Sequence, residues 1–214
     1  MSLKRFIVDN LVERLIPRSR VESYVIGWAR LVFTVRRPFI IGITGSVGKS
    51  TTTAMVAAVL SHPDAERIVG PVAATVGNMN DDIGVAGTML RYGELEIPYA
   101  HAGRLAILFK VPFRALRLLI GGYPRILVLE CGVGSTAHLE GVVEIAPPSI
   151  SAVTRIGAGH LELLGSIDRL VREKGALVRA VPSSGLVLLG QEHEYVSQLE
   201  QMARAPVAKV PGNG

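Results

Sequence analysis

FIIGITGSVGKST, residues 39–51, is the stretch that decides how this sequence is interpreted. It begins as an apolar, largely β-branched run, which is typical of a buried strand. A glycine-containing turn follows and ends in Lys49-Ser50, and residues 52–60 have the composition of a helix. In such a unit, backbone N–H groups and the helix dipole bind phosphate oxygens, the lysine reaches the β- and γ-phosphates, and the serine hydroxyl ligates Mg²⁺. The stretch predicts a nucleoside triphosphate site, the alternative being a glycine-rich turn that serves packing alone.

The composition favours one globular domain that binds an anionic ligand. The chain has 214 residues, of which 49% are hydrophobic and 19% charged, enough for a full core and too apolar for disorder. The net charge of +5 suits nucleotides, nucleotide-sugars, nucleic acid or lipid headgroups, but no aromatic-rich basic motif indicates nucleic acid. The single cysteine, Cys131, is expected to be a free buried thiol. Together with the absence of a signal peptide, it predicts a reducing cytoplasm.

Two apolar segments, residues 24–35 and 105–120, are not expected to span a membrane. The first is short and contains Arg30, and the second is interrupted by Lys110, Pro112, Arg114 and Arg117. The second segment is basic and amphipathic enough to lie on an anionic surface, so peripheral membrane contact stays open. A helix that covers a sheet with its arginine stems flattened on the surface is favoured.

The order of apolar patterns predicts an α/β fold. Residues 1–38 are expected to form N-terminal amphipathic helices, around residues 6–15 and 24–35, before Pro38. In residues 39–214, runs with strand character alternate with helical patterns, which predicts a mainly parallel sheet flanked by helices. The expected strands are residues 39–43, 67–69, 126–130, 150–154 and 186–189, with one more near Val210. Ligands of such sheets bind beyond the carboxyl ends of the strands.

Two chemically capable residues follow expected strands. Glu130 comes after four apolar residues, where a desolvated carboxylate needs a cation such as Mg²⁺ unless it is simply exposed or caps the next turn. His160 lies in a glycine-rich turn after the strand at residues 150–154, where it either reaches a ligand or metal or is structural.

Lys174 falls on the apolar stripe of an expected helix, four residues after Leu170 and three before Leu177. Its side chain either extends outward along the surface or points into the site. In the second case burial would depress the pKa of Lys174 and make its amine reactive toward carbon dioxide.

Four motifs in order resemble those of the Mur ligase family of ATP-dependent amide-forming enzymes. They are TGSVGKST at 44–51, GNMNDDIG at 77–84, LVLE at 127–130 and HLELLGS at 160–166, followed by EKG at 173–175. The phosphate loop is shorter than the general pattern, which requires glycine where Ile43 stands. The resemblance covers most of residues 39–189. It is similar to the central, P-loop NTPase-like domain of the UDP-N-acetylmuramoyl-tripeptide:D-alanyl-D-alanine ligase branch.

The resemblance implies roles for individual residues. It makes Lys49, His160 and Lys174 catalytic, with Lys174 carbamylated, and it places Asn78 and Asn80 on a loop that faces the acceptor substrate. Residues 190–193 stand where the family helps to hold the adenine. The implied phosphate-binding residues are Thr44, Gly45, Ser46, Val47, Gly48, Lys49, Ser50 and Thr51, and the implied Mg²⁺ ligands are Ser50, Glu130, His160 and Lys174.

The implied function is amide-bond formation in peptidoglycan precursor synthesis for the cell wall, with ATP and Mg²⁺ as cofactors. A carboxylate of a UDP-muramoyl-peptide-like acceptor attacks the γ-phosphate, and an amine displaces phosphate from the resulting acyl phosphate. The family's N-terminal substrate domain and C-terminal ligase domain are expected to be absent, which makes the chain a fragment or minimal form whose missing domains a second chain could supply. Two alternatives stay open: a non-ligating ATP-binding module with a regulatory or scaffolding role, and a membrane-surface protein that uses residues 105–120.

Overall fold

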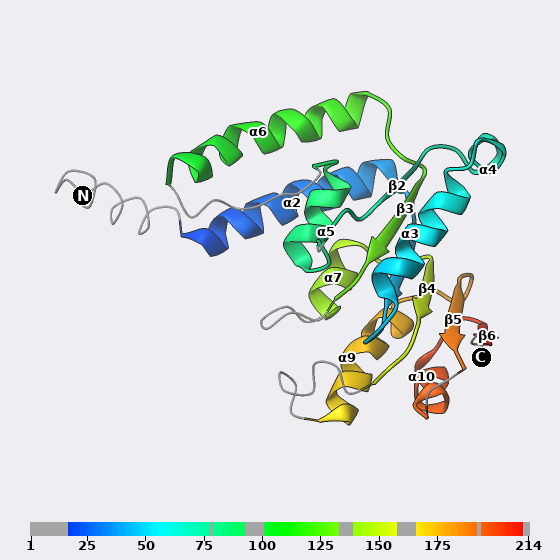
Figure 1. The fold of residues 1–214 in the computed structure, drawn as a ribbon. Helices are drawn as coiled ribbons and strands as arrows, with labels where there is room; N and C mark the ends of the chain where they lie inside the picture. The colour runs from blue at the N-terminus through cyan, green and yellow to red at the C-terminus, as the bar shows by residue number, and fades with distance from the viewer. Residues whose placement is uncertain are drawn as a thin grey trace.

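The computed structural model describes residues 17–77, 79–92, 101–132, 139–157, 166–191 and 194–211. Its strands form a six-stranded sheet in the order β2-β3-β1-β4-β5-β6, in which all neighbours are parallel (Figure 1). The strands are β1 (Phe39–Thr44), β2 (Val72–Ala74), β3 (Ile126–Glu130), β4 (Ile150–Val153), β5 (Leu186–Gly190) and β6 (Val207–Val210). The predicted α/β class and parallel sheet are confirmed.

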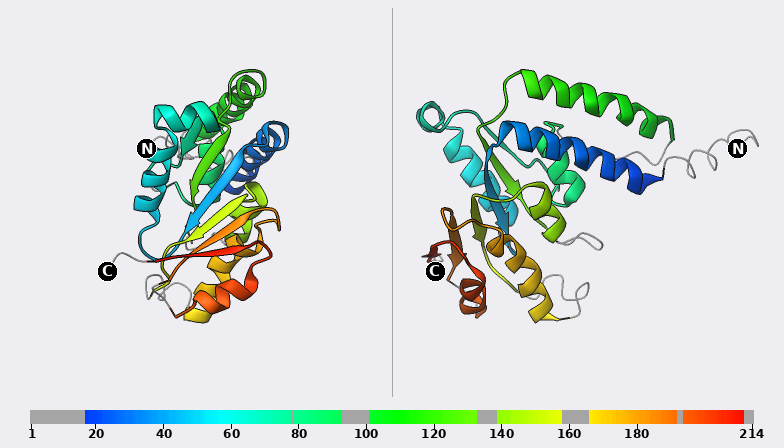
Figure 2. Two further views of the ribbon diagram at one scale, coloured as in Figure 1. Left: turned by 90° about the vertical axis from the view of Figure 1, so that its right-hand side faces the viewer. Right: turned by 180° about the vertical axis from the view of Figure 1, so that it is seen from behind.

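Helices cover both sides of the sheet, but unequally. One side carries α3 (Lys49–Leu60), followed by α4 (Pro63–Val69), and the other carries α5 (Asp82–Met89), α7 (Leu139–Ile145), α9 (Ile167–Arg179) and α10 (Val196–Met202). Figure 2 shows α3 on one side of the strands and α9 and α10 on the other. Because α3 packs against β1, β2 and β3, the described helices on its side leave β5 and β6 uncovered.

The centre of the sheet is where the chain changes direction. From β1 it runs through α3 to the edge strand β2, and from β3 it passes through α7 to β4 on the other side of β1. Crevices at such switch points are the usual ligand sites of open α/β sheets. The register pairs Ile43 with Glu130 and Thr44 with Val153, so the carboxyl ends of β3, β1 and β4 lie side by side.

The predicted strand at residues 67–69 is wrong, because these residues end helix α4. Pro63 occupies the first turn, where its missing N–H costs nothing, and the ring of His62 accepts a hydrogen bond from the Asp64 N–H. Gly70 then ends the helix with a φ of 86°. The strand next to β3 begins two residues later, at Val72.

Two further helices, α2 (Arg18–Arg36) and α6 (His101–Ile120), form an outer layer. Helix α2 packs on α5 and α7, and α6 lies along α2, as Figure 1 shows at the top of the molecule. The expected helix at residues 24–35 is confirmed, whereas residues 6–15 lie outside the described part. The expectation that residues 105–120 cover the sheet is wrong, since α6 covers α2. In the described part of the chain, no helix is long and apolar enough to cross a membrane.

Pro112 lies inside α6 and is accommodated by a contact with α2. Proline has no N–H, so the carbonyl of Leu108, four residues earlier, loses its helical partner. The hydroxyl of Tyr24 on α2 donates to this carbonyl at 3.0 Å. At the end of α6, Arg36 donates from Nε to the Leu118 carbonyl at 2.7 Å. Both bonds fasten α6 to α2 at groups that its own helix leaves unpaired.

Candidate functional site

The loop after β1 requires glycine at two positions. Gly45 has a φ of 151°, and a Cβ there would lie 1.9 Å from the hydroxyl oxygen of Thr154. Gly48 precedes α3 with a φ of 84° in the left-handed region. The expected strand, loop and helix unit is therefore present, and its backbone conformation excludes larger residues at both glycines.

The N-terminus of α3 is prepared for an anion. Its N-cap residue, Gly48, offers no side chain to the first N–H groups, and its first turn contains no acidic residue. Helices α4, α5, α7 and α9 each have an acidic residue there. In α3 the first residue is instead Lys49, and Ser50 and Thr51 are exposed beside it. Unpaired N–H groups, the positive end of the dipole and a lysine are the features that suit a phosphate group.

Thr154, the residue after β4, holds the loop through hydrogen bonds. Its hydroxyl lies 2.6 Å from the Val47 carbonyl and 3.2 Å from the Thr44 carbonyl, both of which can accept from it. The Ser46 N–H donates to the Arg155 carbonyl at 2.6 Å, and the Ser46 hydroxyl contacts the backbone of Gly157. The loop is thus held in shape by β4 and the residues after it.

Glu130 is buried at the end of β3, only 4% exposed. The side-chain amide of Asn80 donates to one carboxylate oxygen at 3.0 Å, and the backbone N–H of Glu130 donates to the Thr75 hydroxyl. Asn80, which the sequence placed on the acceptor-facing loop, therefore positions this carboxylate. The neighbouring Cys131 is buried, and burial raises the pKa of its thiol to about 12, which leaves the thiol unreactive.

Lys174 points into the site and not into solvent. Its side chain is 1% exposed, and its Nζ donates to the Gly45 carbonyl in the phosphate loop at 2.8 Å. Burial, followed by the nearby charge of Lys49, lowers the pKa of Lys174 from 10.5 to about 7. This lowered pKa makes a neutral, nucleophilic amine accessible near neutral pH.

The structure brings together most of the residues singled out from the sequence. Lys49 and Ser50 begin α3, Glu130 lies beside Ile43 at the end of β1, and Lys174 contacts the loop from α9. Asn78 and His160 lie outside the described residues. The described ranges contain no group of three or more histidine, cysteine or acidic side chains that could hold a metal by themselves. A hydroxyl and a carboxylate fit Mg²⁺ when phosphate oxygens complete its coordination, as is usual for this ion.

A groove continues from the loop along the uncovered side of the sheet. It has a volume of about 490 Å³ and is lined by α3, β1, β4, β5 and β6, including Thr52, Ile43, Ala152 and Leu188. Arg155 and Gln191, which follow the carboxyl ends of β4 and β5, are among its lining residues. At Gly190, β5 approaches β4 so closely that a Cβ would lie 2.1 Å from the Thr154 carbonyl oxygen. The volume falls in the range of small-molecule sites, roughly 300–1,000 Å³.

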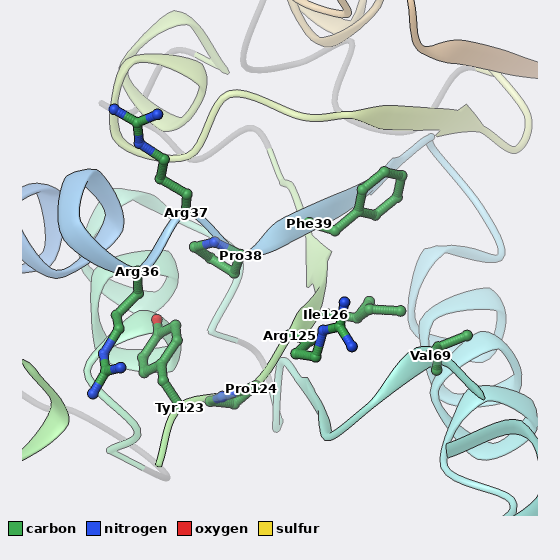
Figure 3. A pocket seen from close by; sticks show the side chains of 9 residues that line it. All are labelled: Arg36, Arg37, Pro38, Phe39, Val69, Tyr123, Pro124, Arg125 and Ile126. Atoms are coloured by element: carbon green, nitrogen blue, oxygen red, sulfur yellow. The ribbon is translucent and has the colours of Figure 1, made fainter. Parts of the chain in front are cut away.

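A second cavity lies at the opposite, amino-terminal edge of the sheet. It has a volume of about 630 Å³ and is lined by three arginines, Arg36, Arg37 and Arg125, with Phe39 and Tyr123 among the rest. Figure 3 shows the guanidinium groups of Arg36 and Arg37 pointing in opposite directions. Arg36 is already engaged with the end of α6. The arginines do not converge on one anion, so the phosphate loop is the better candidate site.

Comparisons with known proteins agree with this arrangement. The family model described as the Mur ligase middle domain matches residues 43–101 and 116–212. The UDP-N-acetylmuramoyl-tripeptide–D-alanyl-D-alanine ligase of Mycobacterium tuberculosis is 32% identical over 171 residues, which are 80% of this chain and 27% of that protein. The ligase of the same name from Synechocystis is 28% identical over 201 residues, 91% of this chain and 37% of that protein.

Solved structures support the same fold. MurF from Acinetobacter baumannii superposes with a TM-score of 0.66 at 20% identity, covering 88% of this chain and 34% of that one. MurF from Thermotoga maritima, determined in complex with ADP, superposes with a TM-score of 0.60 at 20% identity. This match covers 90% of this chain and 37% of that one. The chain thus spans only about a quarter to a third of the length of these proteins, between 27% and 37%.

Proposed function

Because the chain belongs to the Mur ligase family through its middle domain, we propose that it is the ATP-binding part of an amide-bond-forming ligase. The observation that carries this proposal is the meeting of the phosphate loop, Glu130 and Lys174 at the switch point of the sheet. In this proposal, residues 44–51 cradle the phosphates of ATP, and Lys49 neutralises charge on the group being transferred.

Glu130 and Ser50 are the proposed Mg²⁺ ligands. When bound, Mg²⁺ supplies positive charge to the phosphate oxygens and orients them. Glu130 contributes a carboxylate that Asn80 already holds in one orientation, so little ordering is needed on binding. Asn80 then serves as a positioning residue for Glu130, and the assignment of Asn78 to the acceptor side stays a prediction.

Lys174 is proposed to react with carbon dioxide. The ammonium first loses a proton to solvent, and the neutral amine attacks the carbon atom. A new C–N bond forms as one C–O π bond opens onto oxygen, and a second proton leaves the nitrogen, so that the cation becomes a carbamate anion. Beside the positive charge of Lys49, a buried anion is electrostatically better placed than a buried ammonium. We propose that the carbamate and His160 hold a second Mg²⁺.

The groove beside α3 is the proposed site of the adenosine part of ATP. It opens directly from the loop at Thr52 and Thr154, and its apolar walls suit a flat aromatic base. Gln191, exposed at the mouth, has an amide that can hydrogen-bond to the edge of the base. Substitution of Gln191 by alanine should therefore lower the affinity for ATP more than the affinity for inorganic triphosphate.

The proposed reaction is that of the named relatives. A carboxylate of a UDP-muramoyl-peptide acceptor attacks the γ-phosphate and releases ADP, which gives an acyl phosphate. The amine of D-alanyl-D-alanine then attacks the acyl carbon, and phosphate and a proton leave as the amide forms. The chain corresponds to only 27% of the relative with 32% identity, so we propose that further domains, in the same or a second chain, complete the acceptor and amine sites. The predicted division at residues 38 and 39 stays a proposal.

Calorimetric titration with Mg-ATP tests the proposed binding. The wild type should bind, and Lys49→Ala should abolish the binding heat because the cation next to the phosphates is lost. Lys110→Ala is the matched control, since Lys110 is an exposed lysine on α6. Equal affinity of the wild type and Lys49→Ala would refute the phosphate-site assignment.

A non-ligating ATP-binding module is the second candidate, because the chain covers little more than the family's middle domain. ADP release by the 214-residue chain, with acceptor and D-alanyl-D-alanine present, should be slower than about 1 per second, since closure of further domains completes such sites. The ligase proposal requires that a chain completed with these domains forms the amide. ATP binding without amide formation in the completed chain would favour the module.

A further inference from the structure

Helix α6 presents an apolar face to the outside. Phe109 is 76% exposed, Phe113 65% and Ile120 87%, and Leu105 and Leu116 lie on the same side at spacings of three and four residues. The opposite side of the helix is buried against α2 through Ile107, Val111, Ala115 and Leu118. A helix with one buried face normally exposes a polar one, so the outer face of α6 requires a partner.

The charges beside this face have one sign. Over its 20 residues α6 contains one lysine, three arginines and no acidic residue. Arg114 is engaged with the carbonyls at the end of α5, at 3.2 Å from Leu90 and 2.6 Å from Arg91. Lys110 and Arg117 are exposed along the edge of the apolar face. The partner must therefore be apolar and anionic at once.

The outer face is held rigidly. The bonds from Tyr24 to Leu108 and from Arg36 to Leu118 fix the middle and the end of α6 on α2. Figure 1 and Figure 2 show α6 at the rim of the molecule, on the far side of α2 from the sheet. The phenylalanines thus point away from the protein without any rearrangement being needed.

The two phenylalanines of this face lie outside the ATP site and outside the family match. The family model leaves out residues 102–115, which include Phe109 and Phe113, and it begins at residue 43, after α2. The catalytic proposal gives the outer face of α6 no role.

We propose that α6 docks the chain on an anionic lipid surface, lying in the plane of the interface. Its aromatic and aliphatic side chains enter the boundary between headgroups and acyl chains, while Lys110 and Arg117 contact lipid phosphates. The charges in α6 exclude a spanning orientation and agree with the absence of a membrane-crossing helix in the described ranges. A second copy is a poorer occupant, because two such faces would bring Lys110 and Arg117 of both copies together without an opposite charge.

Co-sedimentation with vesicles tests this proposal. The 214-residue chain should bind vesicles with about 30% phosphatidylglycerol at least about tenfold more tightly than neutral phosphatidylcholine vesicles, and more weakly in high salt. Phe109→Ser/Phe113→Ser should lose about tenfold or more of this binding. The control Val59→Ser/Ile68→Ser removes exposed aliphatic side chains from α3 and α4 and should bind like the wild type. Thermal unfolding checks that all variants are folded.

Two charge-reversal variants distinguish docking through α6 from adsorption that depends only on the net charge of the chain. Lys110→Glu/Arg117→Glu should abolish binding, whereas Arg169→Glu/Arg172→Glu, an equal charge change on the exposed side of α9, should retain it. In Trp28→Phe/Phe113→Trp, tryptophan fluorescence should shift to the blue on anionic vesicles and be quenched by brominated lipid.

Three outcomes would overturn the proposal. They are equal losses in both charge variants, no binding of the wild type to anionic vesicles, or a dimer that binds no lipid and dissociates on Phe109→Ser/Phe113→Ser. The last would assign the face to a second copy.

Discussion

Substitution of Lys174 by methionine should make the chain more stable at neutral pH, although it removes a hydrogen bond. Burial and the charge of Lys49 lower the pKa of Lys174 from 10.5 to about 7. At about 1.4 kcal/mol per pKa unit, keeping this side chain protonated in the folded chain costs on the order of 5 kcal/mol. Methionine has a similar shape and no charge, so it avoids that cost.

The loss of one hydrogen bond, to the Gly45 carbonyl, offsets part of the stability that Lys174→Met gains. Nζ donates to this oxygen at 2.8 Å, and methionine cannot replace the donor. An unsatisfied buried carbonyl costs about 1–3 kcal/mol. The net expectation is a variant that is more stable than the wild type by about 2–4 kcal/mol at pH 7 and below.

The sign of the pH dependence follows from the lowered pKa. Between about pH 7 and pH 10.5 the unfolded chain keeps the proton on Lys174 and the folded chain does not. The free energy of unfolding of the wild type therefore gains about 1.4 kcal/mol per pH unit in this window from Lys174. The methionine variant lacks this contribution, so its advantage should be full below pH 7 and should shrink as the pH rises.

Denaturant unfolding of both proteins between about pH 6 and pH 9, in buffers free of carbon dioxide, measures the difference. Lys110→Met is the control, because an exposed lysine should give no pH-dependent difference. A difference that stays constant across this range would refute the argument, since it would mean that the Lys174 amine is solvated. In a completed ligase, Lys174→Met should abolish amide formation despite the intact fold.

Three further substitutions follow from single contacts. Gly45→Ala should lower the free energy of unfolding by about 1–3 kcal/mol and the affinity for Mg-ATP at least about tenfold, because the new Cβ would lie 1.9 Å from the Thr154 hydroxyl oxygen. Gly27→Ala is the control: a Cβ there meets nothing within 4 Å, so this variant should have a higher melting temperature. Glu130→Gln should leave the melting temperature unchanged, but calorimetry should find that Mg²⁺ no longer strengthens ATP binding, and retention of the Mg²⁺ effect would contradict the ligand assignment. Tyr24→Phe should cost about 1 kcal/mol in denaturant unfolding, since the Leu108 carbonyl loses its donor, and an unchanged midpoint would show that water replaces the hydroxyl.

Most of the sheet could be predicted because its strands read as short apolar runs, and the interior strand β3 is buried along its whole length. The expected strand at Ile126–Glu130 agrees to the residue, and the expected β1, β4 and β5 agree within one residue. The strand expected near Val210 is β6. Strand β2 has only three residues, and the β-branched and charged residues before it form a capped helix instead. Local capping by Pro63 and Gly70 outweighed strand propensity there.

The sequence located several residues of the candidate site, but not the contacts between them. Glu130 and Lys174 were found because a carboxylate and an ammonium are costly next to apolar runs. The hydrogen bond from Thr154 to Val47 joins residues that are 107 positions apart in the sequence. The bond from Asn80 to Glu130 joins residues that are 50 positions apart. Such pairings depend on the register of neighbouring strands, which one sequence does not give. A small residue at the end of a strand that flanks the phosphate loop is the one signal that would have pointed to Thr154.

The bond between Lys174 and the Gly45 carbonyl has a further consequence. An ammonium, a neutral amine and a carbamate differ in charge from positive to negative, yet each keeps at least one N–H on the same nitrogen. The donor that supports the loop at 2.8 Å can therefore persist through all three states. The charge of this side chain can therefore reverse its sign while its hydrogen bond to the loop is kept, so a change of charge here does not require a change in the backbone.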